Sequence, residues 1–134
     1  MQTNPNLLSP LSLAFVGDAV FSVLTRERLA VSGINASKLH GLSIKLVSAG
    51  AQAAGMEKIM PMLTQTELAV FKRGRNAHTG NVPKNASAGE YHTATGLEAL
   101  FGYLHLCGER ARIAELFEVI WQASFGNTTT DRTE

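Results

Sequence analysis

The chain has only one cysteine, Cys107, among its 134 residues. A single thiol cannot form a disulfide or a thiolate metal cluster within one chain, so we expect Cys107 to pack as a small hydrophobic residue. Apolar runs as long as the ~18 residues needed to span a bilayer are also missing. Residues 1–6 show no basic region followed by an apolar stretch, so no targeting segment is recognised. These absences predict an intracellular protein that does not enter a membrane.

Strong charge is missing as well, because the formal net charge is only +1. The total charge therefore gives no indication of nucleic-acid binding. An apolar fraction of 45% with 17% charged residues is typical of a globular protein. No segment alternates as a strand, and no repeat or linker divides the chain. We expect one all-α domain over residues 1–126, followed by a frayed polar tail over residues 127–134.

Acidic residues are scarce in two apolar stretches. Asp18 is the only ionisable side chain from Met1 to Thr25 and lies within the sequence LAFVGDAVF. Burying an unpaired carboxylate costs several kcal/mol or shifts its pKa, so such an acid implies a cation, a metal or solvent beside it. The alternative is that Asp18 lies on the solvent side of an amphipathic helix. Glu98 repeats the pattern as the only acid between Tyr91 and Cys107.

Start and stop signals divide the chain into helices. Ser9 followed by Pro10 predicts a long, largely buried helix over residues 10–31. Thr64 with Glu67 three residues later is typical of a capping box that opens another helix. The other expected segments are a helix capped by Ser37, a weakening of helix over 49–55, a short apolar turn or helix over 56–63, a loop over 76–87, and helices over 88–106 and 109–125.

The two isolated acids lie in the two longest expected helices. Because these helices are expected to pack together, Asp18 and Glu98 could meet at one site. Paired carboxylates suit Mg²⁺, a hard cation that prefers oxygen ligands and keeps several waters, one of which can become a nucleophile. The histidines show no zinc-binding spacing, so a zinc site is not expected; they are His40, His78, His92 and His105.

Basic residues gather in the segment KRGRNAHTGNVPKN, residues 72–85. The segment has no acidic residue to neutralise them. Arginine, lysine and asparagine side chains can all donate hydrogen bonds to phosphate. The alternative is a solvated helix end, where the helix dipole favours cations. The candidate RNA-binding residues are Lys72, Arg73, Arg75, Asn76, Lys84 and Asn85.

Three motifs in order resemble the ribonuclease III family. LAFVGDAVF resembles the signature helix of its endonuclease domain, and TGLEALFGYL, residues 95–104, resembles its second acidic motif. FKRGRNA and VPKN resemble the Mini-ribonuclease III subgroup, which lacks the double-stranded-RNA-binding domain. The resemblance covers residues 11–121. Asp18 and Glu98 match two of the four family acids, whereas Ala14 and Thr95 replace the other two. Two carboxylates per site support a tightly held pair of Mg²⁺ ions less well than four do.

The resemblance implies a helical homodimer whose two active sites line one RNA-binding valley. It implies hydrolysis of double-stranded RNA that depends on Mg²⁺, with Mn²⁺ as a substitute, and catalytic, metal-binding roles for Asp18 and Glu98. The implied substrate is the precursor of large-subunit (23S) ribosomal RNA, in bacterial cytoplasm or plastid stroma, with a ribosomal protein as a candidate helper.

Two other readings stay open. Ala14 and Thr95 would also fit a non-catalytic RNA-binding or ribosome-associated module with the same fold. A helical interaction domain without nucleic acid would require the basic segment to be incidental. A homodimer is expected independently, because the apolar side chains of the first helix point in several directions and some should face a partner. These side chains are Phe15, Val16, Val20 and Phe21.

Overall fold

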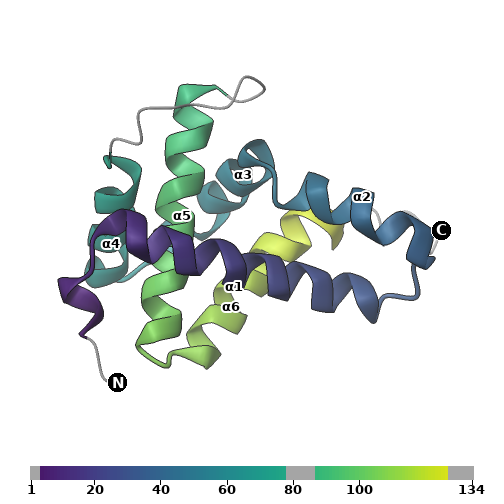
Figure 1. Cartoon of the computed structure of the whole chain (residues 1–134), viewed down its shortest axis with the longest axis horizontal. Coiled ribbons are helices and arrows are strands. Elements are labelled where there is room, and N and C mark those ends of the chain that lie inside the picture. The colour runs from purple at the N-terminus through teal and green to yellow at the C-terminus, as the bar shows by residue number, and fades with distance from the viewer. Residues whose placement is uncertain (1–3, 78–86, 127–134) are drawn as a thin grey trace.

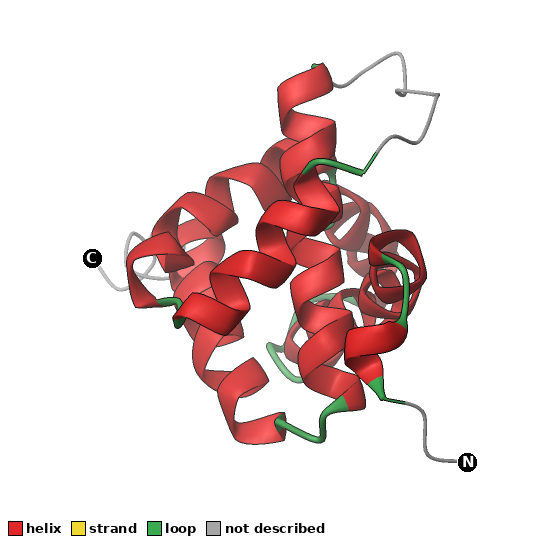
Figure 2. Ribbon diagram, turned by 90° about the vertical axis from the view of Figure 1, so that its left-hand side faces the viewer, coloured by secondary structure: helices red, strands yellow, loops and turns green. Residues whose placement is uncertain are grey.

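The computed structural model describes residues 4–77 and 87–126, and it confirms the all-α class (Figure 1). Figure 2 shows helices and connecting loops, and these described parts contain no strand. The main helices are α1 (Pro10–Ala30), α2 (Ala36–Leu46), α3 (Ala49–Ile59), α4 (Gln65–Arg75), α5 (Ala88–Leu106) and α6 (Arg110–Trp121). Single turns are η1 (Pro5–Leu7), η2 (Met60–Met62) and η3 (Gln122–Gly126). Within the same ranges, no helix is long and apolar enough to cross a bilayer.

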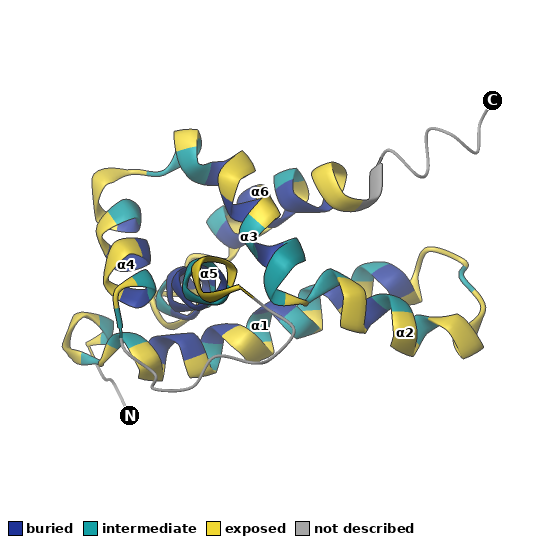
Figure 3. Ribbon diagram, turned by 90° about the horizontal axis from the view of Figure 1, so that it is seen from above, coloured by how far each residue is buried: buried dark blue, intermediate teal, exposed yellow. Residues whose placement is uncertain are grey.

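Helix α5 is the centre of the fold. Figure 3 views it almost end-on, with α1, α3 and α4 arranged around it. Leu97, Leu100 and Phe101 of α5 are fully buried. The ring of Phe101 lies 5.6 Å from that of Phe21 on α1, which in turn lies 5.5 Å from Phe117 on α6. These aromatic contacts join three helices around one core.

Helix ends follow the expected local chemistry. The Ser9 hydroxyl accepts a hydrogen bond from the Ser12 amide at the start of α1. Thr64 and Glu67 form both hydrogen bonds of the capping box at the start of α4. Gly33 and Gly108, which follow α1 and α5, have φ values of +83° and +77°. Glycine adopts this left-handed conformation without the steric cost of a side chain.

Helix α3 corrects the prediction for residues 49–55. The small residues there do not weaken the helix, which runs unbroken from Ser48 as its cap to Ile59. They permit close packing, since a Cβ on Gly55 would lie 2.7 Å from Cγ2 of Ile120. At the next helix boundary, Asn35 rather than Ser37 caps α2, because the Asn35 side chain accepts a hydrogen bond from the Ser37 amide.

Three further expectations were wrong in part. Helix α1 buries only its inner side, and Phe15 is 82% exposed. Cys107 is exposed at the end of α5 instead of packing into the core. Helix α6 ends at Trp121, short of the predicted end at residue 125, and the turn that follows it, Gln122–Gly126, is a π-helix. The predicted tail over residues 127–134 lies outside the described residues.

A charged cluster fixes α6 against the beginning of α4. Arg112 donates to both carboxylate oxygens of Glu67 at 2.8 Å and to the backbone carbonyl of Met62 at 2.7 Å. The side-chain hydrogen bond from Arg112 is the main reason that the pKa of Glu67 is lowered. Since Glu67 is buried, this paired arrangement satisfies a carboxylate that would otherwise be costly to bury.

Candidate active site

The site is built where α1 crosses α5 with the two backbones in contact. A Cβ on Gly17 would overlap the backbone carbonyl oxygen of Glu98, and a Cβ on Gly102 would overlap the carbonyl oxygen of Leu13. Only glycine allows helices to approach this closely. Because Asp18 follows Gly17 along the chain, the crossing sets Asp18 beside Glu98.

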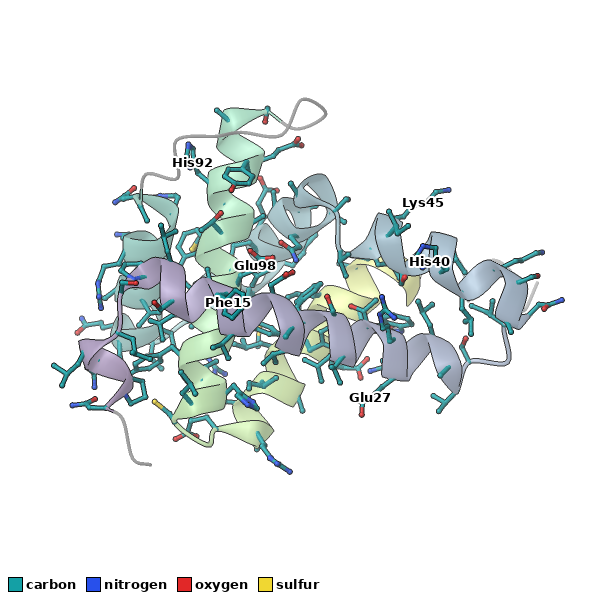
Figure 4. The ribbon with its side chains drawn as sticks, in the orientation of Figure 1. Phe15, Glu27, His40, Lys45, His92 and Glu98 are labelled. Atoms are coloured by element: carbon teal, nitrogen blue, oxygen red, sulfur yellow. The ribbon has the colours of Figure 1, made fainter. Side chains whose placement is uncertain are left out.

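The two acids predicted from the sequence therefore come together, in different environments. Asp18 is exposed, as the amphipathic-helix alternative requires, whereas Glu98 is half-buried. Figure 4 labels Glu98 on α5, next to the crossing with α1. The pKa of Glu98 is raised to about 8, first by burial and then by the charge of Asp18 and a hydrogen bond with it. A carboxylate pair of this kind attracts a cation, which would relieve the repulsion.

Gln52 on α3 is a third member of the site, and it was not among the residues predicted from the sequence. Its side chain is 1% exposed, and its Nε2 donates to Oε2 of Glu98 at 3.4 Å. One signal was available. Gln52 is the only long polar side chain among the small and apolar residues 49–56.

The two positions where the family acids are replaced offer no ligand. Ala14 is buried in a small apolar cluster with Leu13, Val70 and Ala99. Thr95 is also buried, and its hydroxyl donates to the carbonyl of Tyr91 at 3.0 Å. Across the described residues, no three histidine, cysteine or acidic side chains are grouped to hold a metal ion. The site thus offers two carboxylates, whose hard oxygens fit Mg²⁺ or Mn²⁺.

The candidate RNA-binding residues lie at the end of α4. Lys72, Arg73 and Asn76 are exposed. Arg75 is half-buried, with its guanidinium 5.5 Å from the centre of the Phe71 ring, and it donates to Asn76 at 3.3 Å. Helix α4 packs closely on α5, since a Cβ on Gly74 would lie 3.0 Å from Cα of Gly96. Lys84, Asn85 and His78 lie outside the described residues.

Among the described residues, no histidine is hydrogen-bonded to Asp18 or Glu98. His40 and His105 are exposed. His92 stacks edge-on with Tyr91, and its Nδ1 is buried without a hydrogen-bond partner in the part of the chain that the structure describes. No metal-binding group among the described residues includes any of them.

A groove of about 810 Å³ runs along α1 and includes Asp18 in its lining. Its lining is mostly apolar, and Asp18 and Glu27 contribute from α1 while Arg110 contributes from α6. Phe15, one of the lining residues, projects into solvent, and Val23 is 53% exposed. Large apolar side chains exposed together mark a surface that can bind another molecule.

Comparisons with known proteins agree with these features. The sequence profile of the family described as "Ribonuclease III domain" matches residues 11–109. A protein of Symbiobacterium thermophilum named "Mini-ribonuclease 3" is 44% identical over 116 residues, covering 86% of this chain and 89% of that protein. A Brevibacillus brevis protein of the same name is 47% identical, with 86% and 87% covered. A crystal structure of a Fusobacterium nucleatum protein superposes with a TM-score of 0.80 at 28% identity, covering 89% and 96% of the two chains.

Proposed function

Because the chain belongs to the ribonuclease III family and is an endoribonuclease, we propose that it cleaves double-stranded RNA with the aid of Mg²⁺. The observation that carries this proposal is the pairing of Asp18 with Glu98 at the glycine-mediated crossing of α1 and α5. The match to the family profile includes both acids. The family membership also favours the enzyme over the non-catalytic module and the interaction domain.

The carboxylate oxygens of the acidic pair determine the chemistry of the site. Asp18 and Glu98 would hold Mg²⁺, or Mn²⁺ in its place, through carboxylate oxygens. A divalent cation bound there supplies a Lewis acid for the phosphodiester and an activated water. Asp18 is exposed and can meet a substrate directly, whereas Glu98 is held deeper in the crossing. The raised pKa of Glu98 means that it carries full charge at neutral pH only when a positive charge is near.

The basic end of α4 supports the substrate class. Lys72 and Arg73 extend into solvent, where they can contact phosphates. Arg75, Asn76, Lys84 and Asn85 complete the proposed RNA-binding set. Duplex RNA is recognised mainly through shape, phosphates and 2′-hydroxyls, so we expect weak sequence preference and a steep loss of affinity with salt.

We also propose a specific biological substrate. The relatives described above are named "Mini-ribonuclease 3". We take the precursor of 23S ribosomal RNA as the substrate and a ribosomal protein as a candidate helper, in bacterial cytoplasm or plastid stroma. Products with a 5′-phosphate, a 3′-hydroxyl and a short 3′ overhang would support a double-strand cut of this type.

A homodimer is proposed on the exposed face of α1. Phe15 projects from this face and is one of the residues that line its apolar groove. In a twofold dimer the same patch of both copies meets, so each Phe15 ring can enter the groove of the other copy. Glu27 and Arg110 line the same groove and could pair across the axis.

The test of the proposed function is cleavage of a duplex RNA by the wild type and by Asp18→Asn, with Mg²⁺ and with EDTA. We expect cutting only by the wild type with metal. Binding without cutting in both proteins would favour the non-catalytic module.

A further inference from the structure

Gln52 occupies an unusual place for a neutral polar residue. It is 1% exposed, and its side chain crosses from α3 to α5, where Nε2 donates to Oε2 of Glu98. Buried amides are retained where they have a hydrogen-bond partner, because an unsatisfied amide is costly to bury. The contact joins residues 46 positions apart, so it is set by the fold and not by local helix geometry.

We propose that Gln52 is a positioning residue, which orients the Glu98 carboxylate so that it can bind a divalent cation together with Asp18. The inference rests on the proposed metal-dependent nuclease. Gln52 holds Oε2 of Glu98 by a hydrogen bond and thereby limits rotation of the carboxylate about its last torsion. The other carboxylate oxygen stays available to the cation.

A neutral glutamine can orient the Glu98 carboxylate without adding charge to the site, which a charged residue cannot do. A lysine at this place would compete with the cation for Glu98, and a third carboxylate would add repulsion to a pair that is already strained by Asp18. An amide donor fixes the geometry without changing the charge. Ala14 and Thr95 cannot do so, because Ala14 packs in an apolar cluster and the Thr95 hydroxyl donates to Tyr91.

Helix α3 holds the amide in place. Ser48 caps its first turn, and Met56 and Ile59 in its later turns are fully buried in the main core. Gly55 allows this helix to pack against Ile120. The backbone of Gln52 is therefore fixed relative to α5. A separation of 3.4 Å is long for a hydrogen bond, so this contact should add little to the stability of the fold.

The experiment measures Mn²⁺ binding to the protein alone, by calorimetry or electron paramagnetic resonance. Gln52→Met keeps the length and apolar volume of the side chain but removes the amide. We expect Mn²⁺ affinity to fall about 10- to 100-fold, the usual effect of losing a partner that orients a metal ligand. Ser43→Ala is the matched control, because Ser43 is also buried and donates one hydrogen bond, to the carbonyl of His40 on α2.

Activity gives the second readout. With duplex RNA and Mg²⁺, Gln52→Met should lower kcat while the KM for RNA stays unchanged, because RNA is held by other residues. Ser43→Ala should leave Mn²⁺ affinity and kcat unchanged. A purely structural role predicts the opposite result for Gln52→Met, namely a lower thermal midpoint with normal Mn²⁺ affinity and kcat in the folded protein.

A second variant guards against misfolding. Gln52→Asn keeps the amide but shortens the side chain by one methylene, so the donor no longer reaches Glu98. It should weaken Mn²⁺ binding like Gln52→Met. Wild-type affinity in either folded variant overturns the inference, and so does a wild-type protein that binds no Mn²⁺.

These measurements distinguish a failure of the proposed RNA cleavage from a failure of the proposed role of Gln52. A wild-type protein that binds Mn²⁺ but cuts no duplex RNA, with Mn²⁺ affinity lost in Gln52→Met, rejects the proposed cleavage of duplex RNA and supports the role of Gln52. A wild type that cuts RNA, with Gln52→Met equal to it in metal affinity and kcat, supports the nuclease and rejects the role of Gln52.

Discussion

Gly17 of α1 lies directly against the backbone carbonyl of Glu98 on α5, with no room for a side chain between them. The contact places the carboxylate of the next residue, Asp18, beside that of Glu98. A glycine that costs helix stability by itself is thus explained by the approach of two backbones. The acidic pair depends on this approach.

Gly17→Ala should destabilise the protein by about 3 kcal/mol or more, because the added methyl group overlaps a carbonyl oxygen and the helices must separate. Urea unfolding followed by circular dichroism measures the free energy. Gly41→Ala is the control. A Cβ on Gly41 meets nothing within 4 Å, so this exposed helical position should gain about 0.5–1 kcal/mol. A Gly17→Ala protein as stable as the wild type would show that the crossing is not tight.

The raised pKa of Glu98 predicts a specific pH dependence of stability. Burial, followed by the charge of Asp18, raises this pKa from 4.5 to about 8. Between these values the folded carboxyl stays protonated while the unfolded one ionises, so its contribution makes the protein less stable as pH rises. Glu98→Gln removes this contribution. Without metal, the variant should be more stable than the wild type by roughly 1–3 kcal/mol at pH 8 and equal to it at pH 4.

Urea unfolding in EDTA at several pH values measures that difference. Glu57→Gln, on the exposed side of α3, is the control and should follow the wild type at every pH. Wild-type and Glu98→Gln curves that stay parallel from pH 4 to pH 8 would contradict the raised pKa.

The acidic pair was predictable because each acid is the only one in an apolar stretch of its helix. The caps of α1 and α4 were predictable because their chemistry is local, although the cap of α2 is Asn35 and not Ser37. The role of Gln52 was not predictable, because the run of alanine and glycine around it has no hydrophobic period. The helix formed by this run is packed through Gly55 against Ile120, which lies far along the chain. The exposure of Phe15 was also not predictable, because an apolar residue that faces outward on a long helix can have the same sequence spacing as core residues.

Phe15→Asp should convert the proposed dimer into a monomer. If each ring contributes about 2 kcal/mol and a twofold interface contains two rings, the dimer weakens by roughly a thousandfold. Sedimentation at micromolar concentration measures the oligomeric state. Val31→Asp is the control, because Val31 is 83% exposed and does not line the groove, so this variant should remain a dimer. A wild-type protein that sediments as a monomer would reject the dimer.

Replacing Lys72 and Arg73 with alanine should weaken duplex RNA binding at low salt. Each lost phosphate contact should also reduce the slope of log affinity against log salt by about 1. Filter binding over a salt series measures both quantities. Lys58→Ala, an exposed lysine on α3, serves as the control and should change neither. Unchanged affinity and slope in the Lys72 and Arg73 variant would make these residues a solvated helix end.

The most direct measurement is cleavage of a uniformly labelled duplex RNA at low salt by the wild type and by Asp18→Asn, with Mg²⁺ and with EDTA. The wild type should cut only with Mg²⁺, and Asp18→Asn should bind the duplex without detectable cutting. Equal cutting by both proteins, or cutting by the wild type that persists in EDTA, would contradict a metal-dependent site built on Asp18.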